Sequence, residues 1–93
     1  MSAPVVTLYG REGCHLCDEA RAEIVALRGA LPPFELREID IETDARLHAA
    51  FLERVPVVEV GDVLVSELVL DRDALERALA DAPSAQPRLP WGR

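Results

Sequence analysis

The spacing of apolar residues changes several times along the chain, and each change marks a predicted element. A short apolar run over residues 4–9 predicts a buried strand. From residue 14 to about residue 29 apolar residues recur every three or four positions, which is the spacing of an amphipathic helix. Gly29 and the two prolines that follow at residues 32–33 end that helix. Residues 34–41 begin with alternating apolar positions and predict a second strand.

Capping residues predict two further helices. Thr43 is a candidate N-cap for a short helix that carries Phe51 on its apolar side. Asp71 is a candidate N-cap for the last helix, which contains Leu75 and is ended by Pro83.

Two short valine-rich runs predict a hairpin in the second half of the chain. Residues 57–60 and 63–65 are separated only by Gly61-Asp62, which is a two-residue turn of the hairpin type. The predicted order is therefore β-α-β-α-β-β-α. A strand, a crossover helix and a second strand require parallel pairing, whereas the hairpin is antiparallel. This order predicts an α/β fold with a four-stranded mixed sheet and helices on both faces.

The cysteines stand together in the motif Cys14-His15-Leu16-Cys17, at the start of the first predicted helix. Residues three apart at a helix start are close enough for a disulfide. The unpaired N–H groups and the positive end of the helix dipole favour a thiolate on the first cysteine. A C-x-x-C pair between a strand and a helix is typical of a redox site.

Exposure along the helix predicts different roles for the two sulfurs. Cys14, at the helix start, is expected to be the nucleophile with a pKa below that of a free cysteine. Cys17 lies one turn inside and is expected to resolve the mixed disulfide. His15 has two interpretations: a protonated imidazole that stabilises the Cys14 thiolate, or an exposed loop residue without effect.

Composition and charge narrow the class of protein. The chain has 93 residues and a net charge of −7, and all ten basic residues are arginines. Such an acidic chain without a basic stripe is a poor ligand for nucleic acid or an anionic membrane. The apolar runs are too short to span a membrane, and the N-terminus lacks the pattern of a secretory signal. We therefore expect a cytoplasmic location, where a C-x-x-C pair cycles between two redox states.

We expect one domain over residues 1–82 and a flexible, proline-rich C-terminal tail over residues 83–93.

The chain resembles the glutaredoxin family, the smallest form of the thioredoxin fold, over about residues 4–81. The resemblance rests on the strand before the motif, a basic residue, the C-x-x-C loop, a Val-Pro step and a hairpin turn. In this sequence these are Val5–Tyr9, Arg11, Cys14 to Cys17, Arg54-Val55-Pro56 and Gly61-Asp62.

The resemblance implies roles for three further residues. Pro56 is expected to be a cis-proline packed against the disulfide, and Val55 is expected to offer its backbone to a substrate peptide. Without the resemblance, Pro56 would be interpreted as a trans proline at a strand start. Arg11 is interpreted either as a charge that attracts a thiol carboxylate or lowers the pKa of Cys14, or as a solvated loop residue.

The chain departs from the usual family pattern at two places. His15-Leu16 stands between the cysteines where Pro-Tyr is usual, and Ser66-Glu67 follows the hairpin where a Gly-Gly pair is usual. We expect the side chains of Ser66 and Glu67 to crowd glutathione and the Glu67 carboxylate to repel it. Binding of glutathione is therefore predicted to be weak.

These observations predict a thiol–disulfide oxidoreductase that uses Cys14 and Cys17. We expect no tightly bound cofactor and no metal, with glutathione or another low-molecular-weight thiol as a possible co-substrate. Expected partners are disulfide-containing proteins or small thiols and a reductase or thiol electron donor, and the protein is expected to be a monomer. Two alternatives stay open: a metal-binding or metal-delivery module, and a redox-sensing interaction domain.

Overall fold

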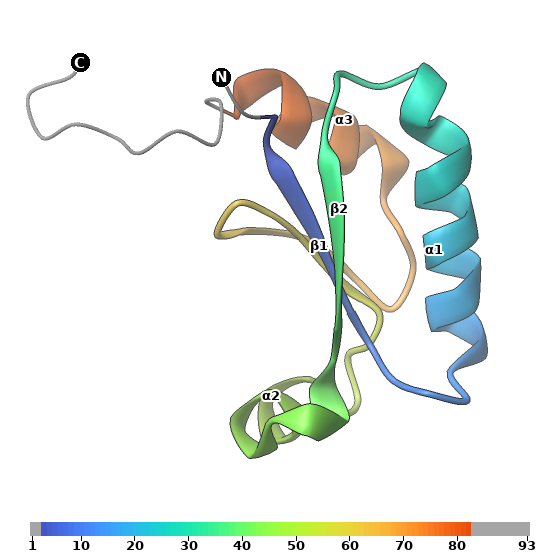
Figure 1. The fold of residues 1–93 in the computed structure, drawn as a ribbon, viewed down its shortest axis with the longest axis vertical. Coiled ribbons are helices and arrows are strands. Elements are labelled where there is room, and N and C mark those ends of the chain that lie inside the picture. Colours follow the sequence, from blue (N-terminus) through green and yellow to red (C-terminus); the bar gives the residue numbers. More distant parts are fainter. Residues whose placement is uncertain (1–2, 83–93) are drawn as a thin grey trace, which may run out of the picture.

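The computed structural model describes residues 3–82 and contains the predicted elements in the predicted order (Figure 1). The strands are β1 (Val5–Gly10), β2 (Glu35–Asp40), β3 (Val57–Val60) and β4 (Val63–Glu67). The helices are α1 (His15–Ala26), α2 (Ala45–Phe51) and α3 (Arg72–Asp81), with short 3-10 helices η1 (Leu27–Gly29) and η2 (Ile41–Thr43).

The four strands form one mixed sheet in the order β2-β1-β3-β4. β1 and β2 are parallel, as the crossover through α1 requires, and β1 and β3 are antiparallel. β3 and β4 form the predicted hairpin, in which Gly61 adopts a φ of 61°. A register shift between Val58 and Glu59 interrupts this hairpin. The predicted four-stranded mixed sheet is confirmed.

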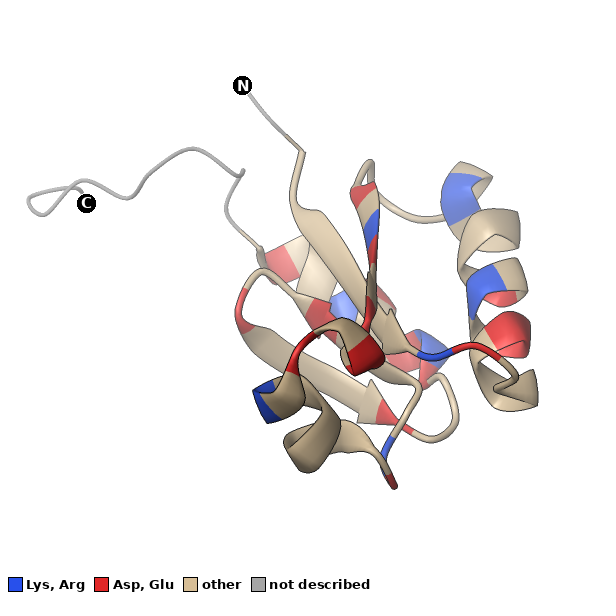
Figure 2. Ribbon diagram, turned by 60° about the horizontal axis from the view of Figure 1, so that its bottom comes forward, with Lys and Arg blue, Asp and Glu red and all other residues tan. Residues whose placement is uncertain are grey.

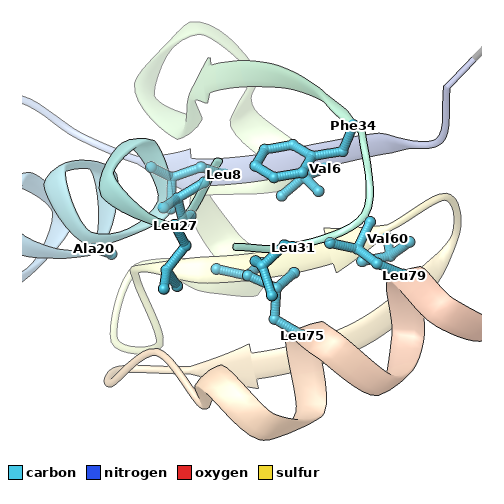
Figure 3. Packing of buried hydrophobic residues seen from close by; sticks show 11 residues of the cluster. Val6, Leu8, Ala20, Leu27, Leu31, Phe34, Val60, Leu75 and Leu79 are labelled. Carbon is cyan, nitrogen blue, oxygen red and sulfur yellow. The ribbon is translucent and has the colours of Figure 1, made fainter. Parts of the chain in front are cut away.

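Most of the hydrophobic core lies between one face of the sheet and the two helices α1 and α3. Figure 3 shows side chains from the strands and from both helices meeting in this layer. Alternate residues of β1 and β3 point to it because strand side chains alternate between faces. The buried strand and helix members are Val6, Leu8, Ala20, Ile24, Val58, Val60, Leu75 and Leu79.

Helix α2 packs against one end of the opposite face. The Phe51 ring lies 5.0 Å from the Tyr9 ring, measured between centroids. Helices therefore lie on both faces of the sheet, as predicted. The uncovered remainder of this face carries charged residues such as Arg37 and Glu59, which occupy positions on either side of Thr7.

The prediction that Thr43 caps α2 is wrong, because Asp44 is the N-cap. The Asp44 carboxylate accepts hydrogen bonds from the N–H groups of Arg46 (2.8 Å) and Leu47 (3.3 Å). Thr43 instead completes η2 and donates its hydroxyl to the Asp40 carbonyl. A carboxylate suits the positive end of a helix better than a hydroxyl, and the 3-10 turn moves the start of α2 one residue along.

The predicted cap of the last helix is confirmed, because the Asp71 carboxylate accepts a hydrogen bond from the Ala74 N–H at 3.0 Å. The second strand is slightly shorter than predicted, since Ile41 turns into η2. Within residues 3–82 no helix is long and apolar enough to cross a membrane. The predicted tail lies outside the described residues.

Tyr9 is predicted to titrate above its ordinary pKa of 10.0, because it is partly buried and its hydroxyl donates a hydrogen bond to Glu59. Tyr9 is the single tyrosine of the chain, so the ultraviolet absorbance of tyrosinate reports on it directly. The folded-state pKa is raised, so this group stabilises the fold below the unfolded-state pKa and the contribution is lost as pH rises through the folded-state pKa. Glu59→Gln should bring the pKa of Tyr9 closer to the ordinary value. An unshifted titration in the folded wild-type protein would contradict the prediction.

Candidate functional site

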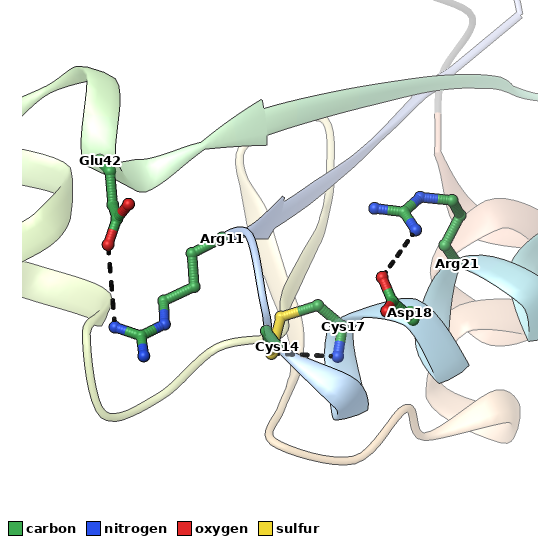
Figure 4. Close-up of a disulfide and its surroundings, with 6 residues drawn as sticks. All are labelled: Arg11, Cys14, Cys17, Asp18, Arg21 and Glu42. Atoms are coloured by element: carbon green, nitrogen blue, oxygen red, sulfur yellow. Dashed lines mark hydrogen bonds and ion pairs between the residues drawn. A yellow bond between two sulfur atoms is a disulfide. The ribbon is translucent and has the colours of Figure 1, made fainter.

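The two cysteines form a disulfide at the point where the chain passes from β1 into α1 (Figure 4). Their Cα atoms are 5.2 Å apart. Cys14 has an extended backbone and is the N-cap of α1, and its Sγ accepts a hydrogen bond of 3.1 Å from the Cys17 N–H. Gly13, with a φ of 75°, provides the reversal that brings the loop to this helix start.

The two sulfurs differ in exposure as the sequence predicts. Cys14 is half-buried at the surface, whereas Cys17 is only 1% exposed. A disulfide or thiol from outside can therefore reach Cys14 and not Cys17. The N–H group directed at Cys14 Sγ and the start of the helix dipole both favour negative charge on this sulfur.

A second, smaller hydrophobic cluster lies under the disulfide. Cys17, Ile41 and Val55 are its buried members, and Cys14 and Phe51 are among the half-buried residues that pack against it. This cluster joins the start of α1 to the end of β2, to α2 and to the segment that enters β3. It fixes the cysteines relative to the Val55-Pro56 step.

The predicted cis-proline is confirmed, because the Val55-Pro56 peptide bond is cis and Pro56 is fully buried. The Val55 backbone is less open than predicted. Its N–H already donates a hydrogen bond of 3.0 Å to the Phe51 carbonyl. Among the residues that the structure describes, the Val55 carbonyl accepts no backbone hydrogen bond outside the helices and strands, and its pairing with a substrate peptide stays a prediction.

His15 and Arg11 both lie near the disulfide, and both contact carboxylates. His15 is 86% exposed in its side chain, and its Nε2 lies 3.0 Å from Oε2 of Glu19, one turn further along α1. Arg11 extends toward Glu42, with 3.9 Å between Nη1 and Oε2, and points away from the sulfurs (Figure 4). The arrangement gives Arg11 no contact with Cys14, and its role in binding a thiol stays a prediction.

An ion pair that no sequence pattern indicated ties the segment before Pro56 to the end of β4. Arg54 and Glu67 pair through a hydrogen bond from Nη2 to Oε2, and the Arg54 guanidinium lies 5.2 Å from the Phe51 ring centroid. This hydrogen bond lowers the pKa of Glu67. Arg54 offsets the charge of Glu67 and so weakens the expected repulsion of a ligand carboxylate, which stays a prediction. In the sequence, the only signal for this ion pair is that Arg54 stands next to the Val-Pro step.

The prediction of which residues after the hairpin crowd a ligand also needs correction. Ser66 is buried on the core side of the sheet opposite Val58, so its side chain cannot crowd the surface. The exposed residues are Leu68 and Val69. Leu68 adopts a φ of 66°, a left-handed conformation that is unusual for leucine.

The loop after β4 is held against the Val55-Pro56 step by backbone bonds. The Leu68 N–H donates to the carbonyls of both Arg54 (3.1 Å) and Pro56 (2.9 Å). Leu68 therefore has a fixed place beside the disulfide.

On the other side of α1 lies a hollow of about 330 Å³, and the buried Cys17 contributes to its wall. Its lining includes Gly10 and Cys17 together with Asp18, Arg21 and Glu38. Arg21 joins the two carboxylates of this hollow, with 3.0 Å between its Nη1 and Oδ1 of Asp18. Among residues 3–82 no group of three His, Cys, Asp or Glu side chains is arranged to hold a metal ion.

Gly10→Ala is predicted to destabilise the folded protein by about 1–3 kcal/mol through overpacking. A Cβ atom at Gly10 would lie 3.1 Å from Cys17 Sγ and 3.2 Å from Cys17 Cβ, beneath the disulfide. Gly29→Ala is the matched control, because a Cβ there meets nothing within 4 Å. Chemical denaturation of both oxidised variants measures the difference. Equal free energies of unfolding for the two variants would contradict the prediction.

Comparison with known proteins agrees with this architecture. The family model described as glutaredoxin-like domain (DUF836) matches residues 5–80. No curated protein matches the chain.

Two solved bacterial structures are similar to this chain over most of its length. The solution structure of protein Ne2328 from Nitrosomonas europaea is 33% identical, has a TM-score of 0.75, and the match covers 85% of this chain and 94% of that one. The X-ray structure of protein XcR50 from X. campestris is 36% identical, has a TM-score of 0.61, and the match covers 84% and 99%.

A thioredoxin from Halobacterium salinarum, a mutant at 21% identity with a TM-score of 0.59, shares the fold, and the match covers 92% of this chain and 80% of that one. At this identity the likeness concerns the fold, a four-stranded mixed sheet flanked by helices. The chain belongs to the glutaredoxin-like domain family (DUF836) and has the thioredoxin fold.

Proposed function

We propose that the protein is a thiol–disulfide oxidoreductase that reduces disulfides of proteins or small molecules. The observation that carries the proposal is the pair of sulfurs at the start of α1, with one accessible and N-capping the helix and the other buried beside it. The structure describes the oxidised form.

The reaction starts from the reduced form. The Cys14 thiolate attacks one sulfur of the substrate disulfide, a mixed disulfide forms, and the other substrate sulfur leaves as a thiolate that takes up a proton. Cys17 then loses its proton and attacks Cys14 Sγ, which releases the second substrate thiol and forms the Cys14–Cys17 disulfide. Two electrons pass from the dithiol to the substrate.

An external reductant returns the protein to the dithiol. It is glutathione, another low-molecular-weight thiol or a protein reductase, and the cytoplasm supplies such donors. The reaction needs no bound cofactor, because the two sulfurs carry both electrons.

Exchange of single cysteines is predicted to separate the two steps. Cys14→Ser should abolish disulfide reduction, because the buried Cys17 cannot reach a substrate. Cys17→Ser should retain the first attack and accumulate the mixed disulfide, because nothing resolves it. Mass spectrometry of the reduced variants after exposure to a disulfide detects the adduct. An adduct on Cys14→Ser at the rate of Cys17→Ser would show that the roles are wrongly assigned.

Glutathione is predicted to reduce the Cys14–Cys17 disulfide slowly compared with mercaptoethanol, a smaller thiol. The reason is the exposed side chains of Leu68 and Val69, where the backbone of a Gly-Gly pair would let the ligand approach closely. Leu68→Gly should raise the rate with glutathione relative to mercaptoethanol. It should change the free energy of unfolding by no more than about 1 kcal/mol, because glycine suits a φ of 66°. Fast, saturable reduction of the wild-type protein by glutathione would contradict the prediction.

A further inference from the structure

A shallow surface beside the disulfide combines apolar and acidic side chains. It lies between the first turns of α1 and the loop from β4 to α3, and it encloses a hollow of about 60 Å³. We call it the docking surface and define it by Leu16, Glu19, Glu23, Leu68 and Val69. Leu16 stands between the two cysteines in the sequence, so this surface begins two residues from Cys14.

The apolar part of the docking surface is exposed and held in place. Leu16 is 43% exposed, Leu68 47% and Val69 71%. The Leu68 N–H bond to the Pro56 carbonyl fixes this loop relative to the cysteines. Exposed apolar residues gathered at a reactive site favour contact with an apolar group of a partner.

The acidic part of the docking surface lacks compensating arginines. Glu19 and Glu23 are four residues apart on α1, an arrangement that places two negative charges on one helix face and weakens the helix. Glu19 contacts His15, and Glu23 has no ion pair among residues 3–82. Figure 2 shows acidic positions on the first turns of α1.

The arginines around the disulfide are already paired with other carboxylates. Arg11 contacts Glu42, and Arg54 contacts Glu67. Arg21 contacts both Asp18 and Glu38. None of these arginines lines the docking surface, so Glu23, which has no ion pair among residues 3–82, is open to a cation from a partner, and Glu19 contacts only His15.

We propose that the docking surface binds a basic polypeptide segment, with an apolar side chain next to the reactive cysteine and lysine or arginine a few residues away. This inference rests on the proposed oxidoreductase function and names its substrate class. Glu19 and Glu23 follow Cys14 by five and nine residues, about 7.5 and 13.5 Å along a helix. An extended peptide covers these distances in about two and four residues.

Two peptides test the charge preference. Each carries a cysteine joined to thionitrobenzoate and a neighbouring leucine, and they differ only in lysine or glutamate two and four residues from the cysteine. Reduced Cys17→Ser protein attacks the peptide sulfur through Cys14, releases coloured thionitrobenzoate and keeps the peptide as a mixed disulfide. The lysine peptide should react at least about tenfold faster at low ionic strength, and salt should remove the difference.

Charge variants separate the docking surface from the net charge of the protein. Removing Glu19 and Glu23 together as glutamines should abolish most of the preference. Glu35→Gln combined with Glu76→Gln is the matched control, because it removes the same charge from exposed positions outside this surface and should leave the preference in place. An equal loss in both double variants would overturn the proposal.

A second pair of variants tests the apolar part. Val69→Ser should slow the reaction with the leucine peptide and not with a glycine counterpart. Val25→Ser, at a residue 50% exposed on α1 and absent from this surface, should change neither rate. Equal effects of the two variants would overturn the apolar part of the proposal.

The proposed function fails separately from the docking surface. The mixed disulfide between mercaptoethanol and thionitrobenzoate is a small substrate without a peptide. If reduced Cys17→Ser protein does not release thionitrobenzoate from this small disulfide, Cys14 is not the nucleophile and the oxidoreductase proposal is overturned. If this small disulfide reacts and the two peptides react equally fast, only the docking surface is overturned.

Discussion

The position of Cys14 as the N-cap of α1 is the constraint on which the site depends. A residue at this position directs its side chain at the free N–H groups of the first turn, and here the Cys17 N–H meets Cys14 Sγ. The same geometry brings the second sulfur within bonding distance of the first and buries it against the sheet. Gly10 leaves the room for Cys17 that any larger residue would take. The exposure of one sulfur and the burial of the other therefore both follow from the way this helix starts.

Contacts within the second half of the chain hold the β4–α3 loop beside the start of α1. The Leu68 N–H bridges two carbonyls of the segment around Pro56, and the Arg54–Glu67 pair joins the same two segments. A leucine in a left-handed conformation costs about 1–2 kcal/mol. The two backbone bonds and the surrounding contacts offset this, so an apolar side chain is kept at the surface next to the disulfide. A glycine at position 68 would leave the backbone open to a ligand, whereas Leu68 covers it with a side chain.

The order of elements, the C-x-x-C site and the cap of α3 could be predicted because each depends on local spacing. The face to which Ser66 points could not, since the register shift between Val58 and Glu59 breaks the alternation along β4. The predicted start of α2 is one residue too early, because Thr43 is part of the 3-10 helix η2 and Asp44 is the N-cap of α2. The ion pair that masks Glu67 joins residues 13 apart, a separation that carries no helical or strand pattern.

The charge around the disulfide bears on how such a protein would choose substrates. A mixed disulfide is covalent, so a substrate needs no tight complex and discrimination falls on the rate of encounter and first attack. Electrostatic steering acts on that rate, and a protein with a net charge of −7 already favours cationic partners from a distance. The pairing of Arg11, Arg21 and Arg54 with carboxylates leaves little positive charge near Cys14 to oppose this field. In the proposed function, selection by charge at the moment of encounter would need only the acidic rim on α1, and the exposed leucines beside it would supply the short-range contact.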